Sequence, residues 1–171
     1  SSASNSHNPV LPANDYNEVS FHLRLDKVTG TSGGLNFNLF GNSGGVYVVR
    51  SSFQTDGTVD SDTVNPGTEA STFSANTWYK VIYNLDYSNN TYRFRMINTT
   101  NSTTLIDTTK SFATNSTVTN LYQDQYVMDA LDGGPKWQID DITYQNEVPE
   151  PAAIGLILAG SVLALRRRSR R

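Results

Sequence analysis

The chain has 171 residues, a formal net charge of −3 and no cysteine. Its length is that of one domain with a single hydrophobic core. The absence of cysteine excludes a disulfide scaffold, a thiolate zinc site, an iron–sulfur cluster and a cysteine nucleophile from this sequence.

The small net charge is an average over two unlike parts. Five of the thirteen basic residues lie after position 165, whereas residues 1–148 hold 8 basic and 15 acidic residues. An acidic body has no basic footprint for phosphates, so nucleic acid is excluded as a partner.

Residues 1–15 show no strand or helix pattern and are expected to be disordered. They contain no initiator Met, no basic region and no apolar run, so they are not an export signal. We expect the sequence to be a fragment or a trimmed form, with a body over 16–147 and a separate segment over 148–171.

The first part of the body predicts three strands. Residues 18–25 alternate Val19, Phe21, Leu23 and Leu25 with polar neighbours, which is typical of a half-buried strand. Residues 35–40 and 46–50 predict two more strands, joined by a glycine-rich turn over 41–45.

A polar stretch over residues 51–77 follows. It predicts at most short strands near Phe53 and Phe73. We expect Asp56, Asp60 and Asp62 to lie in a flexible loop and to serve solubility.

The second half of the body predicts four further strands, over residues 78–86, 91–96, 103–109 and 137–144. The first two form a hairpin with an Asn-rich turn. Apolar residues alternate along 78–86 through Tyr79, Val81, Tyr83 and Leu85, so both tyrosines are expected in the core. Short strands between polar turns favour an all-β antiparallel sandwich or barrel.

Three segments carry a resemblance to a known fold family. WYKVIYNLD at 78–86, NTYRFRM at 90–96 and IDDITY at 139–144 together resemble the concanavalin A-like or laminin G-like jelly roll. The resemblance implies an antiparallel β-sandwich over most of residues 16–145.

An apolar segment lies close to the C-terminus. Residues 152–165 carry no charge, follow Pro149 and Pro151, and precede an arginine cluster that begins with Arg166, Arg167 and Arg168. A helix that is apolar on all sides must be buried in protein or in lipid. It would be about 21 Å long, which is short against a hydrocarbon core of about 30 Å. The arginines favour a membrane segment with a cytoplasmic tail over the alternative, a buried C-terminal helix.

V-P-E-P, the short apolar helix and the terminal arginines together resemble the PEP-CTERM sorting signal of exported proteins in Gram-negative bacteria. The resemblance implies that Pro149, Glu150 and Pro151 are recognised by an exosortase, a membrane-embedded protease that supplies the catalytic residues. It also implies an inner-membrane precursor with a periplasmic body, which is then released to the cell surface or the extracellular space.

Two kinds of candidate site remain in the body. Asp140 and Asp141, with Asp129 and Asp132, are candidates for a calcium site, because hard cations prefer clustered oxygen ligands; no other cofactor is expected. Adjacent strand residues point to opposite faces, so Asp140 and Asp141 converge only across a bulge. The alternative, which this geometry favours, is that one aspartate faces a turn and the other the surface, where they connect loops by hydrogen bonds. Trp78 and Trp137 are candidate sugar-stacking platforms, or edge residues of the core. His22 is expected at the surface.

We therefore expect an exported, non-enzymatic β-sandwich that binds extracellular polysaccharide or serves as a matrix component. The first alternative is a polysaccharide lyase or glycoside hydrolase on the same fold. The second alternative is a structural surface protein without a ligand.

Overall fold

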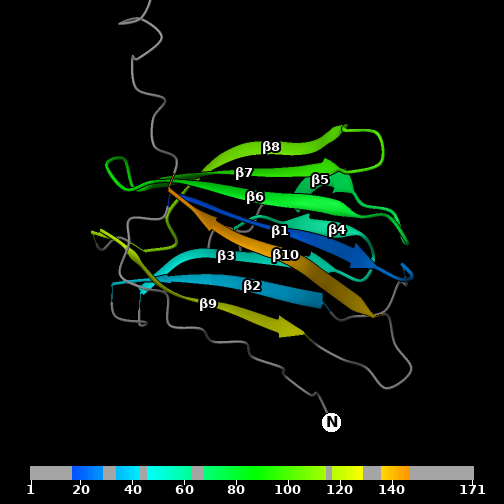
Figure 1. Cartoon of the computed structure of the whole chain (residues 1–171), viewed down its shortest axis with the longest axis horizontal. Coiled ribbons are helices and arrows are strands. Elements are labelled where there is room, and N and C mark those ends of the chain that lie inside the picture. Colours follow the sequence, from blue (N-terminus) through cyan, green and yellow to red (C-terminus); the bar gives the residue numbers. More distant parts are fainter. Residues whose placement is uncertain are drawn as a thin grey trace, which may run out of the picture.

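The computed structural model describes residues 17–28, 34–42, 46–62, 68–114, 117–128 and 136–146. All regular elements in these residues are strands, and they form two antiparallel sheets (Figure 1). The strands are β1 (Glu18–Leu25), β2 (Gly34–Gly41), β3 (Val46–Gln54), β4 (Thr58–Asp60), β5 (Thr68–Thr72), β6 (Tyr79–Asp86), β7 (Thr91–Asn98), β8 (Thr104–Ser111), β9 (Leu121–Met128) and β10 (Trp137–Gln145). The predicted all-β architecture is confirmed.

The two sheets have five strands each. One sheet has the order β10-β1-β6-β7-β8, and the other has the order β5-β4-β3-β2-β9. The first strand of the described chain thus pairs with the last, which places β10 at the edge of its sheet. The seven predicted strands are all present, with ends shifted by a few residues.

The predicted C-terminal helix over 152–165 lies outside the described residues. Within them, no helix meets the length and hydropathy that a membrane crossing requires.

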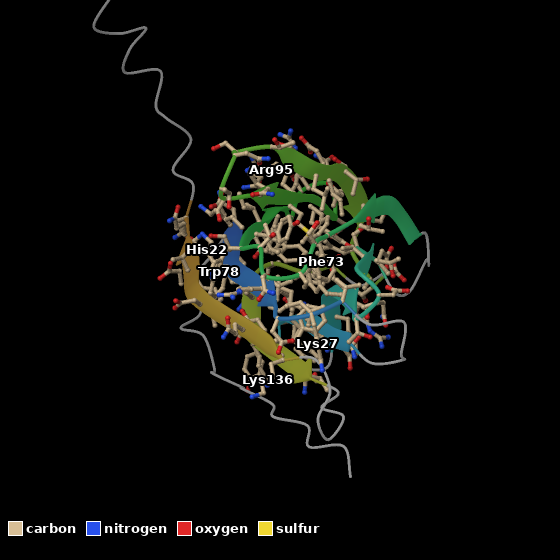
Figure 2. The ribbon with its side chains drawn as sticks, turned by 90° about the vertical axis from the view of Figure 1, so that its right-hand side faces the viewer. His22, Lys27, Phe73, Trp78, Arg95 and Lys136 are labelled. Carbon is tan, nitrogen blue, oxygen red and sulfur yellow. The ribbon has the colours of Figure 1, made fainter. Side chains whose placement is uncertain are left out.

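Aromatic side chains dominate the core between the sheets. Phe21 on β1 and Phe37 on β2 have ring centroids 4.9 Å apart, and Phe37 lies 5.1 Å from Tyr83 on β6. All three side chains are fully buried. Tyr79 is also buried, so both tyrosines of β6 belong to the core as predicted. Figure 2 shows Phe73 among the side chains between the two sheets.

The expectation of a flexible, solubilising loop for Asp56, Asp60 and Asp62 is wrong. β3 continues to Gln54, Asp60 lies in β4, and Asp62 is only 2% exposed. The Asp56 carboxylate accepts hydrogen bonds from the Thr58 N–H at 2.9 Å and from its hydroxyl at 2.7 Å, and so closes the β3–β4 turn. Sequence analysis does not predict the ordered structure of this segment, because its side chains are polar. Their hydrogen bonds are formed within the fold instead of with water.

The sequence analysis missed β9, which pairs with β2 at the edge of its sheet. Its inward side chains include Asp124, which is fully buried, as well as Tyr126. A charged residue at a core position breaks the alternation of apolar and polar residues by which a strand is recognised.

Candidate functional site

The pairing of β1 with β10 contains a β-bulge. Ser20 lies opposite Thr143 and His22 lies opposite Asp140, so Phe21 alone faces the two residues Asp141 and Ile142. Asp141 has a φ of 51°, which is the left-handed region. Asp is one of the few residue types besides glycine that adopt this conformation readily. The Asp141 N–H donates to Oδ1 of Asp140 at 2.9 Å.

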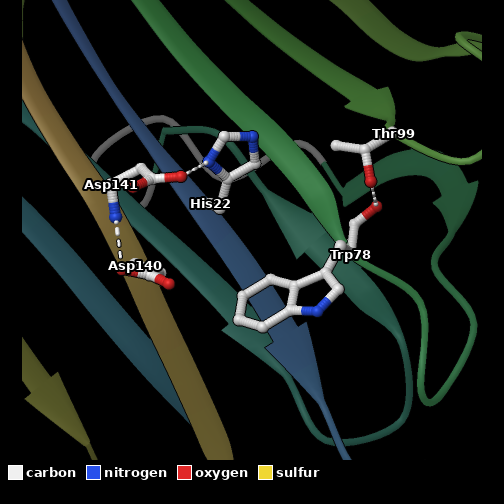
Figure 3. A pocket seen from close by; sticks show the side chains of 5 residues that line it. All are labelled: His22, Trp78, Thr99, Asp140 and Asp141. Carbon is white, nitrogen blue, oxygen red and sulfur yellow. Dashed lines mark hydrogen bonds and ion pairs between the residues drawn. The ribbon is translucent and has the colours of Figure 1, made fainter.

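The bulge brings both carboxylates to one pocket. The pocket has a volume of about 290 Å³ and is lined by His22, Trp78, Thr99, Asp140 and Asp141 (Figure 3). We name it the bulge pocket. Simple alternation would have sent the two aspartates to opposite faces, whereas the extra residue re-aims one of them.

A histidine from β1 and a carboxylate from β10 meet inside the bulge pocket, and they form an ion pair when the histidine is protonated. Nδ1 of His22 lies 3.2 Å from Oδ2 of Asp141, and the two side chains are 29% and 70% exposed. His22 is therefore half-buried, and its partner comes from a strand more than a hundred positions away. His22 lies on the outward face of β1, as predicted, but the neighbouring strand β10 partly covers it.

Trp78 lies in the segment before β6, where backbone contacts hold it. Its carbonyl oxygen accepts hydrogen bonds from the Thr99 N–H and from the Thr99 hydroxyl, both at 3.0 Å. The guanidinium carbon of Arg24 lies 5.9 Å from the Trp78 ring centroid, and Nη2 of Arg24 donates to Oδ1 of Asn76 at 2.9 Å. The Thr99 hydrogen bonds fix the backbone of Trp78, and Arg24 is the contact of its indole ring.

The chemistry of the bulge pocket combines one apolar surface with several oxygen acceptors. Figure 3 shows the Trp78 ring on the same side of the sheet as Asp140 and His22. Carboxylate oxygens accept short, strong hydrogen bonds from hydroxyl groups. An aromatic face packs against apolar C–H surface. A polyhydroxylated ring offers both kinds of group.

Trp137, the other candidate stacking residue, lies elsewhere. It begins β10 as a half-buried side chain, with its ring centroid 5.8 Å from that of Phe73. Its indole nitrogen is buried and has no hydrogen-bond partner among the described residues. Trp137 therefore packs against the core edge, which was the alternative in the sequence analysis.

Several other predicted site residues lie outside the described part of the chain. They are Asp129, Asp132, Pro149, Glu150, Pro151, Arg166, Arg167 and Arg168. The four-aspartate calcium set therefore stays a prediction, and the described residues alone contain no group of three His, Asp or Glu side chains with the geometry of a metal site.

Sequence reasoning identified Trp78 and the two aspartates but missed His22 and Thr99 as their neighbours. His22 is next to Asp140 because β1 and β10 pair, and Thr99 is next to Trp78 because the end of β7 lies against the start of β6. No local signal in the sequence marks either contact.

Comparison with known proteins identifies the fold. No family model matches the chain, and no curated protein matches its sequence. Among solved structures, a chain described as a sialidase aligns with a TM-score of 0.63 and 13% identity over 84% of this chain, but over only 14% of its own length. Lectin II from Ulex europaeus aligns with a TM-score of 0.58 and 10% identity, over 82% of this chain and 81% of its own. A tetrameric galectin from the ball sponge Cinachyrella sp. aligns with a TM-score of 0.57 and 10% identity, over 83% of this chain and all of its own. At these identities the likeness shows the fold alone, which is a lectin-like β-sandwich.

Proposed function

We propose that the body is a non-catalytic glycan-binding domain of an exported protein, and that the bulge pocket takes a neutral sugar. The observation that carries this proposal is the placement of an indole ring and two carboxylates around one open pocket. Two of the structures that share the fold are named as a lectin and a galectin, which supports the same class of ligand.

The charges of the bulge pocket favour a neutral sugar over an acidic one. Among the side chains that line the pocket, Asp140 and Asp141 carry two negative charges and His22 carries at most one positive charge; the Arg24 guanidinium lies outside this lining, 5.9 Å from the Trp78 ring centroid. A carboxylate or sulfate on the ligand would meet the two aspartates at close range. Neutral hydroxyl groups instead donate to the aspartates, while one ring face stacks on Trp78.

Affinity electrophoresis tests this proposal. The protein is run in native gels that contain a soluble β-glucan, galactomannan or the exopolysaccharide of a producing bacterium. We expect retardation by at least one of these polymers, and we expect Trp78→Ala to weaken it about tenfold or more. Ile142→Ala is the matched control, because Ile142 lies in the same bulge but is 36% exposed and does not line the pocket. Absence of retardation, or equal retardation of Trp78→Ala and wild type, would contradict the proposal.

A second candidate function rests on the His22–Asp141 pair. A histidine next to a carboxylate is an arrangement that also serves general acid–base catalysis. The same polymers are therefore incubated with the protein and their chain length is followed by size-exclusion chromatography. Shortening that is lost in Asp141→Asn would favour a polysaccharide-active enzyme over a binding domain. A polymer that is neither retained nor shortened would leave the structural surface protein.

We also propose that residues 148–171 direct export through an exosortase. In a host that has this protease, replacing Pro149, Glu150 and Pro151 together by alanine should leave an uncleaved form in the inner membrane, as seen by immunoblotting of fractions. Glu147→Ala is the control, because it removes a neighbouring charge outside the motif. Normal release of the triple variant would overturn the sorting proposal.

A further inference from the structure

The bulge pocket lies on the sheet that contains β1 and β10. A second depression lies on the outer face of the other sheet. It has a volume of about 310 Å³, and its lining is almost wholly polar. We name it the amide groove. The side chains that matter here are Asn36, Asn38, Arg50, Ser52, Gln54 and Asp60.

Strand register builds the amide groove. Asn36 pairs with Ser52 and Asn38 pairs with Arg50 across β2 and β3, and Ser52 pairs in turn with Asp60 on β4. These positions alternate along β2 with Leu35, Phe37 and Leu39, which are fully buried in the core. The polar rows therefore face outward on three adjacent strands. The Asn38 amide also donates to Oε1 of Gln125 on β9 at 3.1 Å, which orients it.

Arg50 is the distinctive residue of the groove. Its guanidinium carbon lies 4.6 Å from the ring centroid of Tyr47, so the planar group is stacked and held. Among the arginines of the described residues, the others each have a side-chain partner: Arg24 with Asn76, Arg93 with Asp107, and Arg95 with Asn84. Arg50 has no such partner there, and its Nε, like the Nε atoms of Arg24 and Arg95, is buried without an acceptor among the described residues.

A half-buried guanidinium without an acceptor is an incomplete interaction. Desolvating a charged donor costs free energy unless an acceptor replaces the lost water. The planar fork of arginine matches a carboxylate, which accepts two parallel hydrogen bonds from it. The surrounding amides and Ser52 provide donors and acceptors for sugar hydroxyls.

We propose that the amide groove is a second binding site, for a uronic-acid residue of an acidic polysaccharide, with the Arg50 guanidinium binding the sugar carboxylate. Asp60 lies at the β4 edge of the groove, where its Oδ1 accepts the Asp62 N–H at 3.1 Å. The proposal goes beyond the neutral-sugar site. The two sites lie on different sheets, so one domain would bridge an acidic chain and a neutral chain.

Titration calorimetry with oligogalacturonate tests the proposal. The comparison ligand is the same oligosaccharide after its carboxyl groups have been reduced to alcohols. We expect wild type to bind the acidic form, and we expect carboxyl reduction to weaken binding about tenfold or more. This arm needs no variant, so it stands even where a substitution impairs folding. Equal binding of both forms, or no binding of either, would overturn the proposal.

Two arginine variants separate site binding from general charge attraction. Arg50→Gln should weaken oligogalacturonate binding about tenfold or more, while Arg93→Gln, the same charge change on the other sheet, should leave it within about twofold. Equal loss in both variants would show charge attraction without a site. Trp78→Ala should retain oligogalacturonate binding. The loss that this variant causes at the bulge pocket is measured separately, as weaker retardation by the neutral polymers. Failure of the amide groove is thereby distinguished from failure of the bulge pocket.

Discussion

The Tyr144 hydroxyl on β10 donates a hydrogen bond to Oδ2 of Asp124 on β9. The two strands form edges of different sheets, so this contact joins the sheets where no backbone ladder does. Asp124 is fully buried. A buried carboxylate requires donors, and the tyrosine from the opposite sheet provides one of them.

Removal of this donor should destabilise the fold. We expect Tyr144→Phe to lower the free energy of unfolding by about 1–3 kcal/mol, because a buried acceptor loses a hydrogen bond. Urea denaturation measures the change. Tyr122→Phe is the control, because Tyr122 lies on the same strand as Asp124 and is half-buried. This variant should lower the free energy of unfolding by less than about 0.5 kcal/mol. Equal effects of the two variants would contradict the inter-sheet role of Tyr144.

The left-handed backbone at Asp141 leads to a second prediction. Asp141→Gly and Asp141→Val both remove the ion pair with His22, but valine is strained at a φ of 51° whereas glycine is not. We expect the valine variant to be less stable than the glycine variant by about 1–2 kcal/mol in urea denaturation. Equal stability of the two variants would mean that β10 has no bulge at this position.

Acid should weaken the hairpin turn between β6 and β7. The Asp86 carboxylate accepts hydrogen bonds from the Ser88 hydroxyl at 2.6 Å and from the Asn89 amide at 2.7 Å. These bonds, the Ser88 contact first, lower the pKa of Asp86 to about 2. The charged form is favoured by folding, so its contribution to stability is complete above the ordinary pKa of 3.8 and is lost as pH falls toward 2.

Asp86→Asn tests this pH dependence. The variant should unfold at a lower urea concentration than wild type at pH 7, and the difference should shrink as pH falls from about 4 toward 2. Midpoints measured across that range give the answer. A difference that stays constant with pH would show that the Asp86 carboxylate does not stabilise the turn through its charge.

The aromatic core gives a prediction of larger magnitude. Phe37 has ring contacts with Phe21 at 4.9 Å and with Tyr126 at 4.9 Å. Phe37→Ala removes most of this fully buried side chain and should cost about 3–5 kcal/mol in unfolding free energy. Ile142→Ala, at a 36% exposed position, should cost less than about 0.5 kcal/mol. Comparable losses would place Phe37 outside the core.

Alternation of apolar and polar residues was enough to predict most of the fold. β1, β6 and β7 each bury every second residue, and the period of two is a local property of the extended chain. β9 escaped prediction because Asp124 occupies one of its inward positions. The order around β4 escaped because the residues that follow the strand, Ser61 and Asp62, are polar although they are buried.

The candidate sites divide in the same way. Trp78, Asp140 and Asp141 were recognisable from residue type, whereas the sequence analysis did not mark Asn36 and Asn38 on β2 as site residues. Which residues meet was decided by register: one extra residue in β10 turns Asp141 toward His22. The sequence by itself determined an acidic, cysteine-free β body and a separate cationic tail, because composition and period are properties of neighbouring residues. Only the tertiary structure decided which distant side chains share a pocket, because strand pairing and bulges arise from contacts between segments far apart in the chain.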